Sequence, residues 1–124
     1  MKLRGHHLIC LLFLHEAYSE DFTKRLREYF ERLKGGEEVE IISGIDELCS
    51  HCPKYLRGEC DQSEIEDYDE EALSILEMEV GNKTNLNEIT SILKKKGKEL
   101  LEYCEGCEFE QVCKEEVLSF IKEK

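Results

Sequence analysis

Two sets of three cysteines constrain this chain more than any other feature of its sequence. The first set has a CxxC-x7-C spacing and consists of Cys49, Cys52 and Cys60. The second set has a CxxC-x5-C spacing and consists of Cys104, Cys107 and Cys113. A CxxC turn aims both sulfurs at one centre, and a third cysteine a few residues later can reach the same centre. A tetrahedral zinc ion or a 4Fe-4S cluster then needs a fourth ligand.

Metal binding is the best explanation of these cysteines. Disulfides are disfavoured because the chain has seven cysteines, an odd number, and because cytosolic thiols are kept reduced. We expect no secretory signal, since His15 and Glu16 directly follow the apolar stretch 8–14 without a small-residue cleavage site. Neither CxxC lies between a strand and a long helix, as a thioredoxin-type pair would. The spacing alone leaves zinc and iron–sulfur open.

Length and charge limit the other function classes. With 124 residues, of which 37% are charged and 40% hydrophobic, the chain is expected to form a single metal-binding domain, residues 1–124, with one modest core. Its net charge of -12 repels phosphate groups, which argues against nucleic-acid binding. No apolar run is long enough to span a bilayer, so we expect a cytoplasmic protein without membrane contact. An acidic surface of this kind would suit a basic redox partner.

Hydrophobic periodicity predicts two helices in the first third of the chain. The first is expected from Gly5 to His15 or Ala17. The second begins after Ser19, a suitable N-cap, and ends at the two glycines 35–36. Its apolar positions recur at three- and four-residue spacing and are Phe22, Leu26, Tyr29, Phe30 and Leu33.

The rest of the chain adds one short strand and three helices. VEII at 39–42 predicts a strand that can pair with residues 2–4. Helices are expected over residues 69–78, 85–96 and 115–124. Asn85 and Glu88 resemble a capping box at the start of the middle one, and Gly97 is expected to stop it. The expected fold class is therefore mainly α, a small single-domain helical protein with one short two-stranded β element, stapled by a cysteine-ligated metal.

The opening RGHHLIC can supply the missing fourth ligand. On a helix, His6 or His7 shares a face with Cys10. Cys10 could complete one cysteine set, with Arg4 and the amides around Gly5 offsetting the negative charge of a cluster. Alternatively His6 or His7 completes a site, which would raise the potential of an iron–sulfur centre, or a histidine activates Cys10 as a nucleophile. The same residues could also merely pack and cap the helix.

Four segments together resemble an uncharacterised prokaryotic family of small proteins described as predicted iron–sulfur-binding proteins. They are RGHHLIC at 4–10, VEII at 39–42, GIDELCSHCP at 44–53 and LEYCEGCEFEQVC at 101–113. The resemblance implies iron–sulfur binding by the two cysteine sets and no defined activity. Phe109 stands where an indole is usual in that family, and His51 is an addition inside the first CxxC. His51 and His15 are weaker ligand candidates than the two histidines of the opening motif.

The expected function is therefore binding of a cysteine-ligated iron–sulfur cluster, most simply 4Fe-4S, in electron transfer or redox sensing. Its ligands would come from the six cysteines of the two sets, together with Cys10, His6 and His7. At this stage the six cysteines could serve two centres or pool four sulfurs for one. Two other interpretations also stay open: a zinc-stapled binding module, and an enzyme that uses the residues of RGHHLIC beside the metal.

Overall fold

A computed structural model describes residues 1–14, 16–105, 107 and 109–122 of the chain. Within these residues the chain is mainly helical, as the sequence predicts. The α-helices are α1 (Gly5–Phe13), α2 (Glu20–Lys34), α3 (Pro53–Leu56), α4 (Gln62–Leu76), α5 (Leu86–Lys95), α6 (Gly97–Cys104) and α7 (Glu110–Lys122). The strands are β1 (Lys2–Arg4), β2 (Val39–Ile42) and β3 (Lys83–Thr84). A 3₁₀ turn, η1 (Cys49–His51), lies between β2 and α3.

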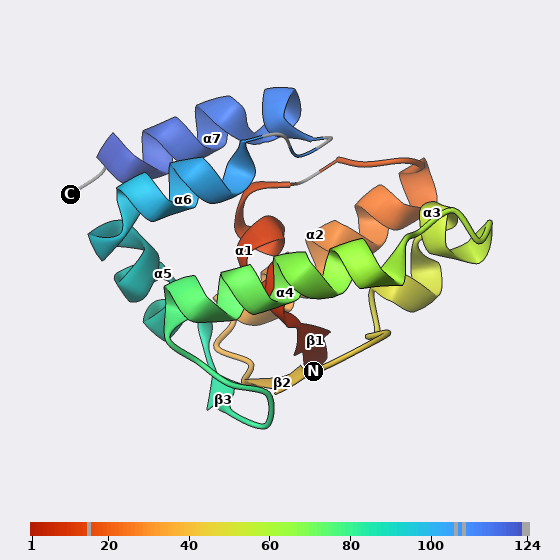
Figure 1. Ribbon diagram of the computed structural model, residues 1–124, viewed down its shortest axis with the longest axis horizontal. Helices are drawn as coiled ribbons and strands as arrows, with labels where there is room; N and C mark the ends of the chain where they lie inside the picture. The colour runs from red at the N-terminus through yellow and green to blue at the C-terminus, as the bar shows by residue number, and fades with distance from the viewer. Residues whose placement is uncertain (15, 106, 108, 123–124) are drawn as a thin grey trace.

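Helix α1 is the centre around which the other elements pack. Figure 1 shows α4 crossing in front of α1, α6 and α7 side by side above it, and the sheet below it. Contacts of α1 with α4, α2 and α7 agree with this view. The buried apolar residues of α1 are Leu8, Ile9, Leu11, Leu12 and Phe13. The opening motif therefore lies in the interior of the fold, and its polar residues must find partners there.

The sheet positions the first turn of α1. Strand β1 pairs in parallel with β2, with Leu3 opposite Ile41, and both side chains are fully buried. Arg4 is both the last residue of β1 and the N-cap residue of α1. Strand β2 also pairs antiparallel with β3, with Val39 opposite Thr84. Strand β3 was not predicted, because two residues are too few to carry an alternating pattern.

The first two helices agree with the periodicity of the sequence. Helix α1 ends at Phe13, earlier than expected, and Leu14 is extended and buried. His15 lies outside the described residues. The Ser19 hydroxyl caps α2 by accepting a hydrogen bond from the Phe22 N–H at 3.1 Å, and the helix ends at the two glycines, as predicted.

Two other helices begin well before the expected residues. Helix α4 starts at Gln62 instead of residue 69. Asp61 caps it, because its side chain accepts a hydrogen bond from the Glu64 N–H at 3.2 Å. Its first turns are acidic and mostly exposed, so they carry little apolar periodicity. Helix α7 likewise starts before residue 115, and its expected last residues, 123–124, lie outside the described residues.

The boundary between α5 and α6 corrects one prediction. Asn85 caps α5 by accepting a hydrogen bond from the Glu88 N–H at 3.0 Å. The capping box is incomplete, because the Glu88 carboxylate accepts from the Thr84 hydroxyl at 2.8 Å instead. Helix α5 ends at Lys95, just before Gly97, as predicted, but Gly97 also begins α6, a helix that was not predicted. A Cβ at Gly97 would lie 3.1 Å from Cγ2 of Ile121, so glycine at this position lets α7 approach closely.

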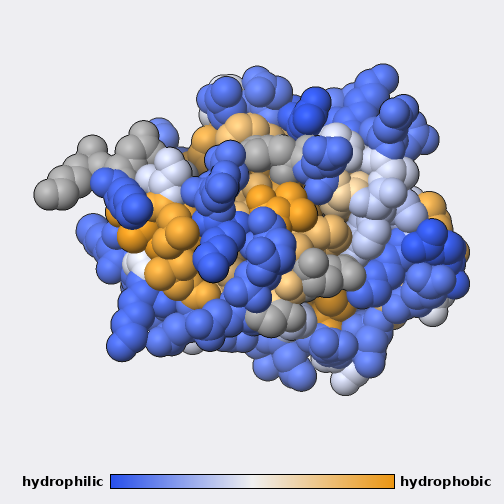
Figure 2. All heavy atoms as spheres, turned by 90° about the horizontal axis from the view of Figure 1, so that it is seen from above, coloured by the Kyte–Doolittle hydropathy of each residue, from blue (hydrophilic) through white to orange (hydrophobic). Residues whose placement is uncertain are grey.

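The surface is mainly hydrophilic. Figure 2 shows the face that carries α6 and α7, where small hydrophobic areas lie between hydrophilic side chains. The large apolar side chains that are exposed are Tyr18, Ile45, Leu56, Val80, Leu101 and Val112. They are scattered over several elements, which is ordinary for a protein surface. None of the described helices combines the length and the apolar character needed to cross a membrane.

Candidate metal centre

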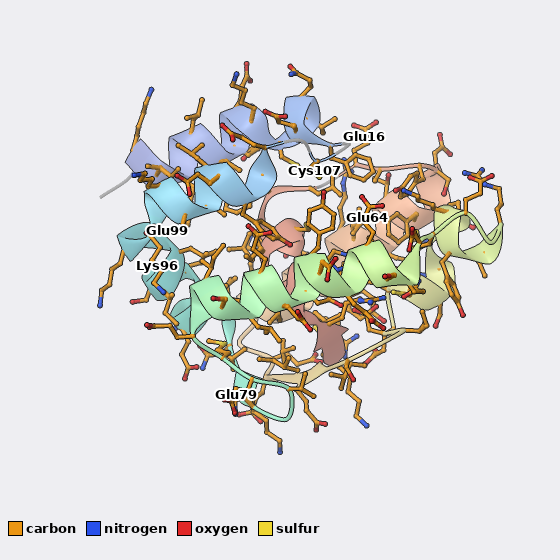
Figure 3. All side chains as sticks on the ribbon, viewed as in Figure 1. Glu16, Glu64, Glu79, Lys96, Glu99 and Cys107 are labelled. Carbon is orange, nitrogen blue, oxygen red and sulfur yellow. The ribbon has the colours of Figure 1, made fainter. Side chains whose placement is uncertain are left out.

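All seven cysteines of the chain line one cavity of about 330 Å³. Its walls come from α1, η1, α3, α4 and the connection between α6 and α7. Figure 3 shows Glu64 on α4 and Cys107 on that connection at facing sides of this space. His6, His7 and Arg4 line the same cavity. The fold therefore gathers the seven cysteines and the two histidines of the opening motif around one cavity.

Both CxxC segments close with the same backbone turn. The Cys52 N–H donates to the Cys49 carbonyl at 3.0 Å, and the Cys107 N–H donates to the Cys104 carbonyl at 3.3 Å. Pro53 follows as the first residue of α3, a position where the missing N–H of proline costs nothing. The two sets are thus alike in backbone structure, as their common spacing predicts.

Cys10 lies with the second cysteine set. Burial raises the pKa of the Cys10 thiol, and the charges of Cys107, Cys104 and Cys113 raise it further. Charges have such effects only when the groups are close together. Helix α1, which carries Cys10, also contacts α7, which carries Cys113. We refer to these four cysteines as the Cys104 end of the cavity.

The other three cysteines form what we call the Cys49 end, together with Arg4. Arg4 is fully buried. Its Nη1 donates to the Cys49 Sγ at 3.6 Å and to the Gln62 Oε1 at 3.0 Å. The Gln62 amide in turn donates to the Cys60 Sγ at 3.3 Å. One guanidinium therefore reaches two of the three sulfurs, directly or through one neighbour.

Asp69, on α4, holds Arg4 and His6 together. Its Oδ2 accepts from the Arg4 Nε at 2.7 Å. Its Oδ1 accepts from the His6 backbone N–H at 2.9 Å and lies 2.6 Å from the His6 Nδ1. Gly5 permits this close approach of α1 to α4, because a Cβ there would lie 2.5 Å from the Asp69 carbonyl oxygen.

Asp46 does the same for His7 and Cys49. Its Oδ2 accepts from the Arg4 backbone N–H at 2.8 Å and lies 2.5 Å from the His7 Nδ1, and its Oδ1 accepts from the Cys49 N–H at 2.9 Å. Burial alone would raise the pKa of Asp46, but the hydrogen bonds from His7 and from these backbone groups lower it well below its usual value. Both carboxylate oxygens of Asp46 already have hydrogen-bond partners. Asp46 is therefore better suited to orienting its neighbours than to binding a metal.

The two histidines are held in one orientation by these carboxylates. Their ring centroids lie 4.1 Å apart. Burial, followed by the charge of His7, lowers the pKa of His6 to about 4 despite its hydrogen bond to Asp69. Burial alone would raise the pKa of Asp69, but hydrogen bonds from His6 lower it. Near neutral pH the pair is therefore an ionised carboxylate and a neutral imidazole, which donates through Nδ1 and keeps Nε2 as an acceptor.

One buried donor at the Cys49 end has no partner. Among the described residues, Nη2 of Arg4 is buried without a hydrogen bond. Burial alone would lower the pKa of Arg4, but its hydrogen bonds to Cys49 and Asp69 raise it, so the group stays charged. Leaving a buried charged donor unpaired is costly. Nη2 of Arg4 is therefore an unsatisfied donor inside the packed wall of the cavity.

Several of these thiols resist ionisation in the absence of a cation. Burial, followed by the charge of Cys107, raises the pKa of Cys104 to about 12 and that of Cys113 to about 11. Burial, followed by the charge of Asp46, raises the pKa of Cys49 to about 11. A bound metal reverses this balance, because it favours the thiolate form. Any metal that bound these cysteines would therefore displace protons from them.

No three of the described thiol sulfurs are as close together as those of a closed zinc site. Zinc–sulfur bonds of about 2.3 Å place two sulfurs of a tetrahedral site about 3.8 Å apart. Among the described residues, no three thiol sulfurs lie within 4.8 Å of one another. The group that does meet this limit consists of His7, Asp46 and Cys49. In a 4Fe-4S cluster each cysteine binds a different iron, which separates the sulfurs further than a single ion does.

The two aspartates are the functional residues that the sequence did not reveal. Asp46 lies three residues before Cys49, and an Asp at that distance from a turn is a local capping signal. Asp69 is 63 residues away from His6, so no local pattern marks it. His51 is exposed and is not among the residues that line the cavity, while His15 falls outside the described residues.

A protein family described as "Protein of unknown function (DUF1284)" matches residues 17–113 of the chain. The matched segment contains both three-cysteine sets, and RGHHLIC lies before it. No curated protein and no solved structure matches the chain.

Proposed function

The chain belongs to the DUF1284 family of proteins of unknown function, and we propose that it binds iron–sulfur clusters of the 4Fe-4S type. In this proposal Cys10 is the fourth thiolate for the second cysteine set. The observation that carries the proposal is the meeting of Cys10 with Cys104, Cys107 and Cys113 at one end of the cavity. Four thiolates are the usual complete ligand set of such a cluster.

Two further features favour a cluster over a single zinc ion. No three of the described thiol sulfurs lie as close together as the ligands of one tetrahedral zinc ion would. In addition, each end of the cavity offers hydrogen-bond donors to sulfur: Arg4 at Cys49, and the Phe109 N–H at Cys107. Hydrogen bonds to sulfur are one of the means by which proteins set the potential of an iron–sulfur centre.

We assign a second, different centre to Cys49, Cys52 and Cys60. This set has three thiolates, and the groups nearest to it are Arg4, His7 and Asp46. Its positive guanidinium would offset the negative charge of a thiolate-bound cluster. The two centres should therefore differ in potential, with the higher potential at the Cys49 end.

The role that suits two such centres is one-electron transfer or redox sensing. The chain's part is to hold the thiolates, exclude bulk water from a lined cavity and set the charge around each end. The net charge of -12 would favour docking of a basic redox partner in the cytoplasm. A zinc-stapled binding module is the competing function, and the metal content distinguishes the two.

The test is anaerobic reconstitution of the full chain with iron and sulfide. We expect a brown protein with a broad absorption band in the visible region, iron and sulfide in equal amounts, and two distinguishable electron paramagnetic resonance signals after reduction. A colourless protein that retains stoichiometric zinc and rejects iron would overturn the proposal.

Matched cysteine variants then assign the ligands. Cys10→Ser should remove the signal of the Cys104 end and leave the other signal unchanged. Cys49→Ser should do the reverse. If Cys10→Ser leaves iron content and both signals as in the wild type, Cys10 is not a ligand.

A further inference from the structure

The backbone of Tyr18 is strained. Its φ is 59°, in the left-handed region that bulky residues rarely adopt. The Ser19 N–H donates to the Ala17 carbonyl at 2.7 Å, which closes a three-residue turn around Tyr18, and such turns with a positive φ are rare and strained. Thr23 holds the turn in place, because its hydroxyl accepts from the Ala17 N–H at 3.2 Å. A glycine would adopt this conformation without the strain.

The position of the Tyr18 ring gives a reason for a tyrosine at this turn. Burial contributes little, since Tyr18 is 42% exposed. Its ring lies edge-on to the ring of Phe109, with the centroids 5.1 Å apart and the planes at 78°. A second ring contact joins Tyr18 to Phe22, with the centroids 5.8 Å apart. Ring pairs of this kind are attractive, so the strained turn holds the Tyr18 ring against Phe109.

The two rings lie between the cysteine-lined cavity and a groove on the surface. The groove is lined by residues of 16–32, together with Phe109 and Val112. Tyr18 and Phe109 line both the groove and the cavity. Phe109 also adjoins two cysteines of the Cys104 end: its N–H donates to the Cys107 Sγ at 3.5 Å, and its carbonyl accepts from the Cys113 N–H at 3.0 Å. The ring pair is therefore a wall that this end of the cavity shares with the groove.

We propose that Tyr18 and Phe109 form an aromatic cover that shields the Cys104 end of the cavity from water and small solutes in the groove. The other groove residues include charged side chains on α2, so without the rings the thiols of this end would face a polar, hydrated surface. Strained residues of this kind are concentrated at functional sites. The cover should act on one end only, because the groove residues come from 16–32 and 109–112. It concerns the thiols themselves and does not rest on the proposed function.

The first test measures how fast iodoacetamide alkylates each cysteine of the metal-free full chain, by mass spectrometry of its peptides. Tyr18→Asn removes the ring, and asparagine tolerates the left-handed backbone. We expect alkylation of the buried Cys113 to become about tenfold faster, because a ring contact favours the closed arrangement by about that factor. Alkylation of Cys60, at the other end, should not change. The same factor at every pH would show that access has changed and that thiol ionisation has not.

Two matched variants serve as controls. Tyr18→Phe keeps the ring, so Cys113 should react at the wild-type rate. Val112→Ala shortens an exposed side chain that lines the groove and not the cavity, and it too should leave the rate unchanged. Equal alkylation of Cys113 in Tyr18→Asn and in the wild type would overturn the cover. Faster alkylation of all cysteines with a lower midpoint of thermal unfolding would also overturn it, because the ring would then merely hold the fold together.

Reconstitution with iron and sulfide separates this proposal from the proposed function. On exposure to air, the visible absorption band should decay faster in Tyr18→Asn than in the wild type or Val112→Ala, and equal decay would count against the cover. Alkylation as expected in a chain that incorporates no iron would support the cover and overturn the iron–sulfur assignment. Complete clusters in a chain whose alkylation does not respond to Tyr18→Asn would do the opposite.

Discussion

The two ends of the cavity share one backbone turn but have different surroundings. At the Cys49 end, groups from β1, α4 and the loop before η1 form a connected set of hydrogen bonds through Arg4, Asp46 and Asp69. At the Cys104 end, the hydrogen bond that reaches a described sulfur comes from the backbone, from the Phe109 N–H to Cys107 at 3.5 Å. One end is organised by charged side chains, and the other by its thiols and main chain.

This difference predicts that the two ends depend on metal to different degrees. The Cys49 end has partners for its charges before any metal binds, apart from one nitrogen of Arg4. The Cys104 end gathers four thiols that would repel one another once ionised. We therefore expect the structure of the Cys49 end to persist without metal, and the structure of the Cys104 end to depend on it.

Metal removal is expected to have the largest effect. Metal–thiolate sites can contribute on the order of 10 kcal/mol to folding. Amide hydrogen exchange of the metal-free protein should show lost protection over the described residues between 104 and 113, and retained protection over residues 46–52. Equal loss at both ends would contradict the comparison.

Asp69→Ala tests the charged network of the Cys49 end. The change leaves Arg4 buried without its carboxylate partner, which should cost about 3–5 kcal/mol in the free energy of unfolding. Asp67→Ala is the matched control, because Asp67 lies on the same helix and is exposed. Its cost should stay within about 0.5 kcal/mol. Denaturant unfolding of the metal-free protein measures both, and similar losses would refute the role given to Asp69.

Acidification should weaken the same end through His6. Its pKa is about 4 in the folded protein and about 6.5 when unfolded, so between these values the unfolded chain binds a proton that the folded chain does not. Stability should fall by about 2 kcal/mol from pH 7 to pH 5. His6→Asn should flatten this dependence, as measured by denaturant unfolding at each pH. A variant with the slope of the wild type would show that His6 does not cause it.

The smallest effect is expected at the Cys104 end. The Tyr103 hydroxyl donates to the Tyr68 carbonyl at 3.3 Å. Tyr103→Phe removes this neutral hydrogen bond and should cost about 1 kcal/mol, measured by thermal unfolding of the metal-free protein. A loss as large as that of Asp69→Ala would mean that this end too has a side-chain network.

The fold could be predicted from the sequence where its cause was local. Ser19 and Asn85 cap helices as expected, because a cap acts within one turn. The first turns of α4 were missed because they are rich in acidic residues and show little of the apolar periodicity that predicts a helix. Helix α6 was missed because Gly97, which packs against Ile121, was expected to end one helix and not to begin another.

In the candidate site, too, the residues with a local sequence signal could be predicted, and those placed by packing could not. The cysteines were identifiable from their spacing, and the two histidines from their place next to Cys10. Which set Cys10 joins depends on how α1 meets α6 and α7, and the sequence leaves that open. Asp69 lies 63 residues from His6, so only the packing of α4 on α1 brings the two together.

The shared use of Asp69 has a consequence for mutagenesis. Arg4 and His6 bind opposite oxygens of one carboxylate, so loss of either frees that carboxylate to shift away from the other. Their effects should then be epistatic, with the double variant less impaired than the sum of the single variants. In a screen of single substitutions, the stability losses measured for Arg4 and for His6 would each include part of the same interaction with Asp69.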